Sequence, residues 1–331
     1  MTVRMQDIAD HLGLSVSTVS LALRSAPQIA EDTRKRVHET AEHLGYTHRP
    51  RHITRTALKH IVFTTYTAPD NAFYGAVLSG AERECRYYNM ALRYQRIETS
   101  RISLRAQHNH IDGVLIVGSI DDQTIEYLCK LGRVHVLVDN NPPSLDLDRV
   151  VIENKRSVRS ALVYLHQLGH RRIAYFSGPL THSSFRERRQ GYYAAVQELG
   201  LQPFEIPCSS LEAQDITQAV SQHLTPGTTL PFTAIMTCND LAALSILYTL
   251  QERGIDVPGH VSIIGFDNID VASVVRPSLT TCHVDRELLG MLAVRRLVER
   301  INEPDSAMIT VSIATTLVKR NSTSAPMEMS H

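Results

Sequence analysis

The side chains best suited to metal or redox chemistry do not stand in the spacings that such chemistry needs. His108 with His110, and His166 with His170, have spacings that a metal ion could use, but no cysteine or third ligand stands near either pair. The five cysteines are odd in number, scattered and without a Cys-x-x-Cys pair: Cys85, Cys129, Cys208, Cys238 and Cys282. We therefore expect surface histidines, reduced thiols of a cytoplasmic protein, no disulfide and no metal.

Motifs of the common enzyme classes are missing as well. The sequence holds no GxGxxG, no GxxxxGK and no GxSxG stretch, so a dinucleotide-binding, P-loop or hydrolase assignment has no anchor. An enzyme of sugar metabolism would need a nucleophile or an acid/base pair, and the sequence offers none that can be named. We expect no enzyme, no catalytic residue and no cofactor, and keep a sugar-metabolism enzyme as an alternative.

The strongest chemical pattern is a pair of short helices near the N-terminus. Residues 7–12 have apolar side chains at helical spacing and end at Gly13, and Ser15 can cap a second helix over residues 16–23. That second helix turns Val19 inward. The side chains left outside are Val16, Ser17, Ser20 and Leu21. This helix-turn-helix indicates DNA binding, although any small helical hairpin would share part of the pattern.

Charge supports DNA binding through its distribution rather than its sum. Over the whole chain 34 basic and 34 acidic residues cancel, whereas residues 1–60 hold nine Lys and Arg against six Asp and Glu. Between His48 and His60 there are four basic residues and no acid. A basic run beside a helix-turn-helix is the expected footprint of contact with DNA phosphates, although a solvated linker would look similar.

The remaining elements have to position these side chains. A third helix over about residues 30–44 completes a minimal helical bundle that ends near Tyr46. From residue 61 onward, apolar runs of strand length alternate with helical segments, twice over. The expected strands are 61–63, 90–94, 113–117, 134–138, 173–176, 234–237 and 262–266, and the expected helices are 76–88, 187–199 and 240–253. This alternation predicts two lobes of parallel sheet covered on both faces, with ligands at the carboxyl ends of the strands.

Two features separate this chain from exported and membrane proteins. No apolar run approaches the ~18 residues of a membrane span. The N-terminus leads straight into polar helical sequence with no signal peptide, and a secreted sugar-binding protein would need one in place of the helix-turn-helix. We expect a cytoplasmic protein with no membrane partner, and keep a sugar-binding protein that does not act on DNA as a second alternative.

Several stretches together resemble one family, the LacI/GalR (lactose-repressor) family of bacterial transcriptional regulators. They follow the family's order, near its spacing, over nearly the whole chain. They are DIA at 7–9 with LSVSTVS at 14–20, AEHLGY at 41–46, IDGV at 111–114, LGHRRIA at 168–174, GFD at 265–267, PSLTT at 277–281 and LVKR at 317–320. The resemblance implies a ligand-responsive transcription factor, in this family most often a repressor.

The same resemblance implies the domain order. A small all-α helix-turn-helix domain would be followed by a hinge and by a two-lobed α/β core with parallel sheets, similar to periplasmic binding proteins. The expected bounds are 1–47 for the DNA-binding domain, 48–59 for the hinge, 60–321 for the core and 322–331 for a disordered tail. Within the core, we expect 60–155 and 284–314 in the first lobe, 156–283 and 315–321 in the second, and chain crossings near 154–157, 282–285 and 313–316.

The resemblance also implies partners: a near-palindromic operator in double-stranded DNA, a second copy of the chain, and a small effector between the lobes, for which we favour a sugar or sugar derivative. Some relatives form tetramers through an added C-terminal helix. Here residues 321–331 are rich in Ser, Thr and Met and carry no heptad, so a homodimer is favoured.

The resemblance assigns DNA contacts to the second helix and the hinge. They are Ser15, Val16, Ser17, Thr18, Leu21, Arg24, Arg49, Arg51, Arg55 and Leu58. Position 21 departs from the family, which most often has Arg there. Unless it turns into the bundle, Leu21 can touch only a thymine methyl or another apolar edge, so we expect an operator that differs from the commonest family consensus. Leu58 would wedge into a minor-groove step, with packing against the core as the alternative.

The resemblance likewise assigns an effector site: Phe73, Tyr74, Asp139, His182, Ser184, Arg188, Asn239 and Asp267. The guanidinium of Arg188 would meet vicinal hydroxyls or a carboxylate. Phe73 or Tyr74 would stack on the ligand, unless both simply pack in the core. The acidic and amide side chains follow expected strands, whereas the loop of His182 and Ser184 varies with the effector in this family. For Asp240 we prefer a role as a helix cap.

Overall fold

The computed structural model describes residues 5–23, 30–44, 58–97, 111–224 and 230–327. The chain divides into two compact units, one up to Ala57 and one from Leu58 onward. Among the described residues, none of the helices combines the length and the apolar character needed to cross a membrane.

The first unit is a bundle of three short helices, α1 (Met5–Leu12), α2 (Val16–Leu23) and α3 (Glu31–His43). Each helix contributes two fully covered apolar side chains to a small core: Ile8 and Ala9, Val19 and Ala22, Val37 and Ala41. The hydroxyl of Ser15 accepts a hydrogen bond from the Thr18 amide at 3.0 Å, as a helix cap does. The predicted helix-turn-helix and its cap are therefore confirmed.

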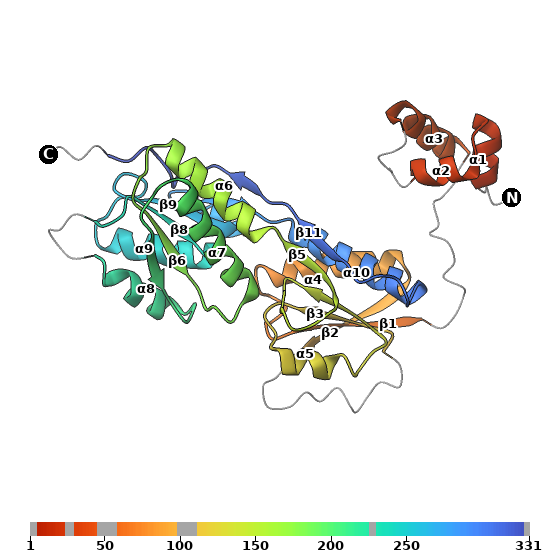
Figure 1. Cartoon of the computed structure of the whole chain (residues 1–331), viewed down its shortest axis with the longest axis horizontal. Helices are drawn as coiled ribbons and strands as arrows, with labels where there is room; N and C mark the ends of the chain where they lie inside the picture. The colour runs from red at the N-terminus through yellow and green to blue at the C-terminus, as the bar shows by residue number, and fades with distance from the viewer. Residues whose placement is uncertain (1–4, 24–29, 45–57, 98–110, 225–229, 328–331) are drawn as a thin grey trace. The chain divides into compact units, whose positions relative to one another are not determined.

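The second unit begins with a six-stranded, wholly parallel sheet, which defines the N-lobe. Its strands, in spatial order, are β11 (Thr310–Ile313), β5 (Asp148–Ile152), β4 (Val134–Val138), β3 (Gly113–Val117), β1 (Lys59–Thr65) and β2 (Met90–Arg96). The α4 (Tyr74–Tyr87) and α10 (Arg286–Asn302) helices cover one face, and α5 (Asp122–Leu128) covers the other (Figure 1). Alternate residues of β3 serve the two cores, as the period of a strand requires.

A second six-stranded sheet defines the C-lobe. Its strands, in spatial order, are β12 (Thr316–Val318), β10 (Thr280–His283), β9 (Ser262–Asp267), β8 (Ala234–Thr237), β6 (Ile173–Ser177) and β7 (Phe204–Pro207). The α6 (Asn154–Gln167) and α7 (Ser183–Glu198) helices cover one face, and α8 (Ala213–Ser221) and α9 (Asp240–Glu252) cover the other. Only β12 runs antiparallel to its neighbour, so the prediction of parallel sheets is confirmed with this one exception.

The chain passes between the two sheets three times: from β5 into α6, from β10 into α10, and from β11 into β12. Each passage is short, with Glu153, Val284 with Asp285, and Ala314 with Thr315 between the elements. The three passages let the lobes share a continuous apolar core that includes Ile152, Val284 and Ile313. The carboxyl ends of parallel strands in both lobes can then line one cleft.

Residues 322–327, expected in a disordered tail, pack instead against the C-lobe. The Ser322 hydroxyl donates to the Ile263 carbonyl at 2.6 Å and accepts from the Thr280 amide at 2.9 Å. The buried ring of His170, expected at the surface, bonds the Thr233 hydroxyl and the Ser324 carbonyl, both at 2.9 Å. The Ser and Thr residues here predicted a disordered tail because they show no periodic apolar pattern. In the structure their hydroxyls form hydrogen bonds with polar groups beside β9 and β10.

Candidate functional site

Two aspartates stand at the carboxyl ends of strands in opposite lobes. Asp139 directly follows β4, and Asp267 is the last residue of β9. Both are buried, and both have a positive φ, 52° at Asp139 and 114° at Asp267. Residues other than glycine rarely adopt such a backbone conformation. When they do, they are often found at functional sites, where the surrounding structure enforces the conformation.

Asp139 binds side chains from both lobes. The Tyr74 hydroxyl, on the first residue of α4, donates to Oδ2 at 2.9 Å, and the Ser184 hydroxyl, in the first turn of α7, donates to Oδ1 at 2.6 Å. Burial raises the pKa of Asp139, opposed by the charge of Arg188 and by these two donors. Burial also raises the pKa of Tyr74 well above its usual value, which keeps its hydroxyl a donor. Asp139 therefore links the N-lobe to α7 of the C-lobe.

Arg188 lies buried beside this link, held on three sides. Its Nε donates to the Asn154 side-chain oxygen at 2.8 Å, and its Nη1 donates to the Cys238 carbonyl at 2.5 Å. The guanidinium also lies 3.5 Å from the centre of the Phe266 ring, a cation–π contact that orients its plane. These contacts fix the donor fork before any ligand arrives.

Asp267 faces Arg188 with an unused acceptor. Its Oδ1 lies 3.5 Å from Nη1 of Arg188, close enough for charge attraction, yet that buried oxygen accepts no hydrogen bond from the described residues. Burial raises the pKa of Asp267 well above its usual value; Arg188 opposes the shift and the neighbouring Asp240 adds to it. A buried acceptor without a donor is costly, so this oxygen suits a hydroxyl or amine donated by a ligand.

Asn239, and not Asp240 as the sequence suggested, caps the α9 helix. Asn239, which precedes α9 with extended backbone, caps the helix by accepting from the Ala242 amide at 2.9 Å. Asp240 already lies inside the helix, so its carboxylate accepts instead from the Ile269 amide at 2.9 Å and the Thr281 hydroxyl at 2.6 Å. The preference for Asp240 as the cap was therefore wrong. Burial raises the pKa of Asp240 to about 6.

Two glycines make room for these side chains. A Cβ on Gly265 would lie 2.1 Å from Oδ1 of Asp240, which explains the glycine two residues before Asp267. Gly118 has a φ of 82°, and a Cβ there would lie 2.9 Å from the ring of Tyr74. The ring of Phe73 in turn meets Tyr74 edge-on at 5.0 Å, and both rings are half-buried against the core.

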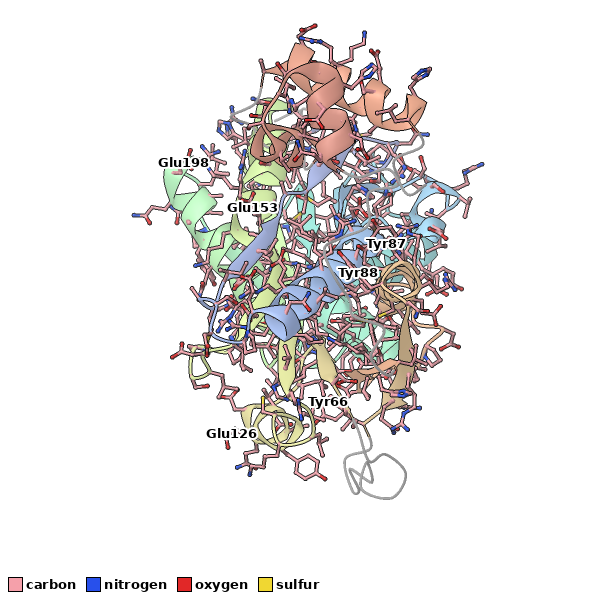
Figure 2. All side chains as sticks on the ribbon, turned by 90° about the vertical axis from the view of Figure 1, so that its right-hand side faces the viewer. Tyr66, Tyr87, Tyr88, Glu126, Glu153 and Glu198 are labelled. Atoms are coloured by element: carbon pink, nitrogen blue, oxygen red, sulfur yellow. The ribbon has the colours of Figure 1, made fainter. Side chains whose placement is uncertain are left out.

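An open cavity of about 370 Å³ is lined by residues of both lobes. His182 of the C-lobe lines it and stacks on Phe185 at 4.8 Å, and burial lowers the pKa of His182. Tyr66 lines the N-lobe side and donates to Asp121 at 2.9 Å. Figure 2 shows Tyr66 beside α5, the helix that carries Glu126. The sequence analysis missed Tyr66 and its neighbours, since nothing in their local pattern marks a cleft.

The sequence analysis also missed polar contacts that join the lobes next to Arg188. Asn141, two residues after Asp139, donates from its amide to the Ser183 hydroxyl at 3.0 Å and from its side chain to Glu187 at 2.7 Å. Glu187 also accepts from the Asn154 side chain at 2.9 Å. The sequence signal that could have indicated these residues was their position next to Asp139 and Arg188 along the chain.

On the DNA-binding side, the structure describes only part of the expected set. Val16 exposes 38% of its surface, and Leu58, just before β1, exposes 49%. Ser15 and Thr18 bond each other through their hydroxyls at 2.8 Å. The expected contacts outside the described residues are Arg24, Arg49, Arg51 and Arg55, together with the side chains of Ser17 and Leu21.

The structure also bears on metal binding. His108 and His110 lie outside the described residues. Within the ranges that the structure describes, no three His, Cys, Asp or Glu side chains gather as a metal site would require.

Comparison with family models separates the same two parts of the chain. Residues 4–48 match the model for bacterial regulatory proteins of the lacI family, and residues 162–323 match the model for a periplasmic binding protein-like domain.

Two relatives align over nearly their whole length. The HTH-type transcriptional repressor PurR of Photobacterium profundum is 28% identical over 311 residues, which cover 90% of this chain and 92% of that protein. The ribose operon repressor of Escherichia coli is 29% identical over 338 residues, covering 96% and 99%.

Solved structures share the fold. The lac repressor dimer bound to operator and the anti-inducer ONPF superimposes with a TM-score of 0.71 at 23% identity, over 98% of this chain and 100% of that one. The complex of the transcriptional regulator CelR with cellobiose gives a TM-score of 0.71 at 24% identity, over 97% and 99%. A regulator from Enterococcus faecium with bound ribose gives 0.70 at 24% identity, over 81% and 99%.

Proposed function

We propose that this chain is a DNA-binding transcriptional regulator of the LacI family and not an enzyme, and that it is a dimeric repressor controlled by a small effector. One observation carries the proposal: a helix-turn-helix unit is followed by a core whose two lobes bring buried polar side chains to one cleft. A protein that acts on bacterial DNA works in the cytoplasm, so a cytoplasmic location is part of the proposal.

A sugar or sugar derivative is the effector class that suits this cleft. Asp267 offers an unpaired acceptor and Arg188 a fixed donor fork, and a sugar hydroxyl can serve as either partner. The donors of Arg188 and the unpaired acceptor of Asp267 lie side by side, so a neutral hydroxylated ligand can use both, whereas a carboxylate can use only the donors. The ribose operon repressor among the relatives, and the cellobiose and ribose bound in the related structures, fit this class.

The proposed mechanism is a shift between two arrangements of the lobes. An effector that contacts side chains of both lobes stabilises the arrangement in which those side chains come together. It can change operator affinity only by the difference between its affinities for the two arrangements.

An apolar surface on the C-lobe supports the dimer. Leu241 and Tyr248 lie two turns apart on α9 and expose 46% and 63% of their surfaces. The neighbouring segment η1 (Asp270–Ser273) and the residue after it expose Val271 and Val274, and the Ile269 amide bonds this segment to Asp240 of α9. Exposed apolar side chains that share a surface mark protein contacts, and a second copy would present two recognition helices to a palindrome.

Operator binding tests the DNA part of the proposal. We expect selection from random DNA with the full-length protein to enrich a near-palindromic site that differs from the commonest family consensus. Affinity for that site should fall steeply with salt, because Lys and Arg would displace counterions from DNA phosphates. A failure to enrich any site, or an affinity that does not change with salt, would overturn it.

A thermal-shift screen of sugars, nucleosides and organic acids tests the effector part. We expect sugars or sugar derivatives to raise the melting temperature, because a ligand that binds the folded state stabilises it. A hit must also change operator affinity in a binding titration. Stabilisation only by organic acids would contradict the proposed effector class.

Sedimentation of two variants tests the dimer. Tyr248→Asp places a charge on the exposed α9 surface, and we expect it to shift the protein towards monomer. Leu180→Asp is the matched control, since Leu180 exposes 41% of its surface on a loop of the same lobe and is not part of α9. If Tyr248→Asp remains as dimeric as the control, the second copy does not bind at this surface.

A further inference from the structure

Arg286 is not among the residues assigned above to the effector site. It is the first residue of α10, directly after the chain passes from β10 of the C-lobe back to the N-lobe. Its side chain is only 14% exposed. A cavity of about 390 Å³ adjoins it, lined by Ala72 and Ala76 on one side and by Asp270 and His283 on the other.

The guanidinium of Arg286 binds main-chain carbonyls of both lobes. Nη1 donates to the Ala72 carbonyl at 2.6 Å, and Nη2 donates to the Asn268 carbonyl at 3.3 Å. Ala72 directly precedes Phe73 and Tyr74, and Asn268 directly follows Asp267. One side chain therefore joins the loop that carries the N-lobe aromatics to the loop that carries the unpaired carboxylate. The carboxylate of Asp270, 3.6 Å away, is fully exposed and adds little.

The Asn268 loop is held in a strained conformation by several hydrogen bonds. Asn268 has a φ of 56°, next to the φ of 114° at Asp267. Its amide donates to the Thr281 hydroxyl at 3.3 Å, and its side chain contacts His283 at 3.0 Å and accepts from Arg320 at 2.8 Å. These three partners all belong to the C-lobe. Among the hydrogen bonds of Asn268 in the described residues, the one from Arg286 comes from the N-lobe side.

We propose that Arg286 is a positioning residue of the effector cleft, which bridges the Ala72 and Asn268 carbonyls and so couples closure of the lobes to the placement of Tyr74 and Asp267. This inference rests on the proposed function, because it presumes an effector between the lobes. Charged donors make stronger hydrogen bonds to carbonyls than neutral ones, and the planar fork of Arg reaches two acceptors that a Lys ammonium cannot span. When the lobes part, the guanidinium can turn to the water of the adjoining cavity.

Other hydrogen bonds join the lobes without Arg286. Asp139 and Asn141 bind Ser184, Ser183 and Glu187 at the start of α7. Removal of the Arg286 bridge leaves these contacts in place. The lobes of a variant should therefore open on the Arg286 side without falling apart.

The test measures the separation of the lobes in the full-length protein without any ligand. Spin labels are placed through a bio-orthogonal amino acid at the exposed positions Gln123 on α5 and Gln214 on α8, since the chain has five cysteines of its own. Pulsed electron paramagnetic resonance then gives the distribution of distances between the lobes. We expect Arg286→Gln to shift or broaden this distribution relative to the unsubstituted protein.

Arg171→Gln is the matched control. Arg171 also donates to main-chain carbonyls, those of His166 and His170, but both belong to its own lobe. We expect its distance distribution to equal that of the unsubstituted protein. A distribution for Arg286→Gln that does not differ from this control would overturn the proposal.

Two further measurements keep the test decisive. If Arg286→Gln fails to fold, Arg286→Lys keeps the charge but not the two-armed fork, and it should also widen the distribution; an unchanged distribution for Arg286→Lys would overturn the bridge. Operator affinity should stay unchanged for Arg171→Gln, whose position lies neither in the DNA-binding unit nor between the lobes. If the unsubstituted protein binds no operator, the proposed function is wrong. If it binds an operator but the lobe distances of Arg286→Gln equal those of the control, only the proposed role of Arg286 is wrong.

Discussion

Asp139 and Asp267 occupy matching positions in the two lobes, yet they differ in how their oxygens are used. Each stands at the carboxyl end of a buried strand with a positive φ, and burial raises the pKa of both. Both oxygens of Asp139 accept a hydroxyl hydrogen bond, one from Tyr74 and one from Ser184. One oxygen of Asp267 accepts none from the described residues.

The difference separates a structural carboxylate from one available to a ligand. Asp139 already satisfies its acceptors with side chains from both lobes, so it stabilises their contact. Asp267 keeps an acceptor beside the fixed guanidinium of Arg188, so a ligand hydroxyl would gain a hydrogen bond there without displacing a protein donor. Variants that remove one partner at a time should respond differently at the two positions.

The largest effect is expected from Arg188→Ala. Removing the guanidinium leaves two buried acceptors, the Asn154 side-chain oxygen and the Cys238 carbonyl, without their donor, and each should lower the free energy of unfolding by about 1–3 kcal/mol. The effector response should be abolished while operator binding remains, because the helix-turn-helix is a separate unit. Chemical denaturation and an operator titration measure the two quantities.

Arg189→Ala is the control for that variant. Arg189 is the adjacent residue of α7, but it pairs with Glu205 at a partly exposed site, where such pairs contribute at most about 1 kcal/mol. Normal effector binding by Arg188→Ala in calorimetry would show that Arg188 is not part of the effector site.

A smaller loss is expected from Ser184→Ala, which acts on Asp139. The substitution leaves Oδ1 of Asp139 without its donor from the C-lobe, and a lost hydrogen bond to a charged group costs about 1.5–3 kcal/mol. Ser160→Ala serves as the control, since the Ser160 hydroxyl bonds only its own helix at an exposed site. Equal denaturation midpoints for the two variants would show that Asp139 does not depend on Ser184.

The pH dependence of stability should distinguish Asp267 through the variant Asp267→Asn. Burial and Asp240 raise the pKa of Asp267, so above about pH 4 the unfolded chain releases this proton while the folded protein retains it. The folded state then loses stability as pH rises, by at most about 1.4 kcal/mol per pH unit, until its own pKa is passed. Asparagine does not titrate, so the stability of the variant relative to the unsubstituted protein should increase with pH. Denaturation between pH 4.5 and 7.5 measures it; parallel curves would contradict the prediction.

The strands and the polar residues that end them could be read from the sequence because both are local. The bounds expected for β3, β4 and β8 agree with the structure, since short apolar runs between polar segments mark buried strands. Asp139 and Asp267 came from the family resemblance, and their positions after expected strands agree with this pattern. The short strands β11 and β12 did not, because half-exposed edge strands mix polar and apolar side chains.

The partners of those polar residues could not be predicted, because they come from distant parts of the chain. Tyr74 and Asp139 are 65 residues apart, and no local pattern records that their side chains meet. The bridge from Arg286 to Ala72 joins residues 214 apart. At Asn239 and Asp240, a shift of the helix start by one residue decided which side chain caps and which is buried.

The smallest effect is expected at Asn239, where a cap and a ligand contact can be separated. Asn239→Ala removes the acceptor for the Ala242 amide and should cost about 1 kcal/mol, whereas Asn239→Ser keeps a capping oxygen and should cost only a few tenths. Both variants lose the amide group that would contact an effector beside Asp267. If both weaken effector binding equally while only the alanine variant loses stability, Asn239 contributes to the ligand site as well as to the helix. If effector binding falls only with stability, Asn239 acts as a cap alone, and Asp267 is the acceptor that this edge of the C-lobe offers.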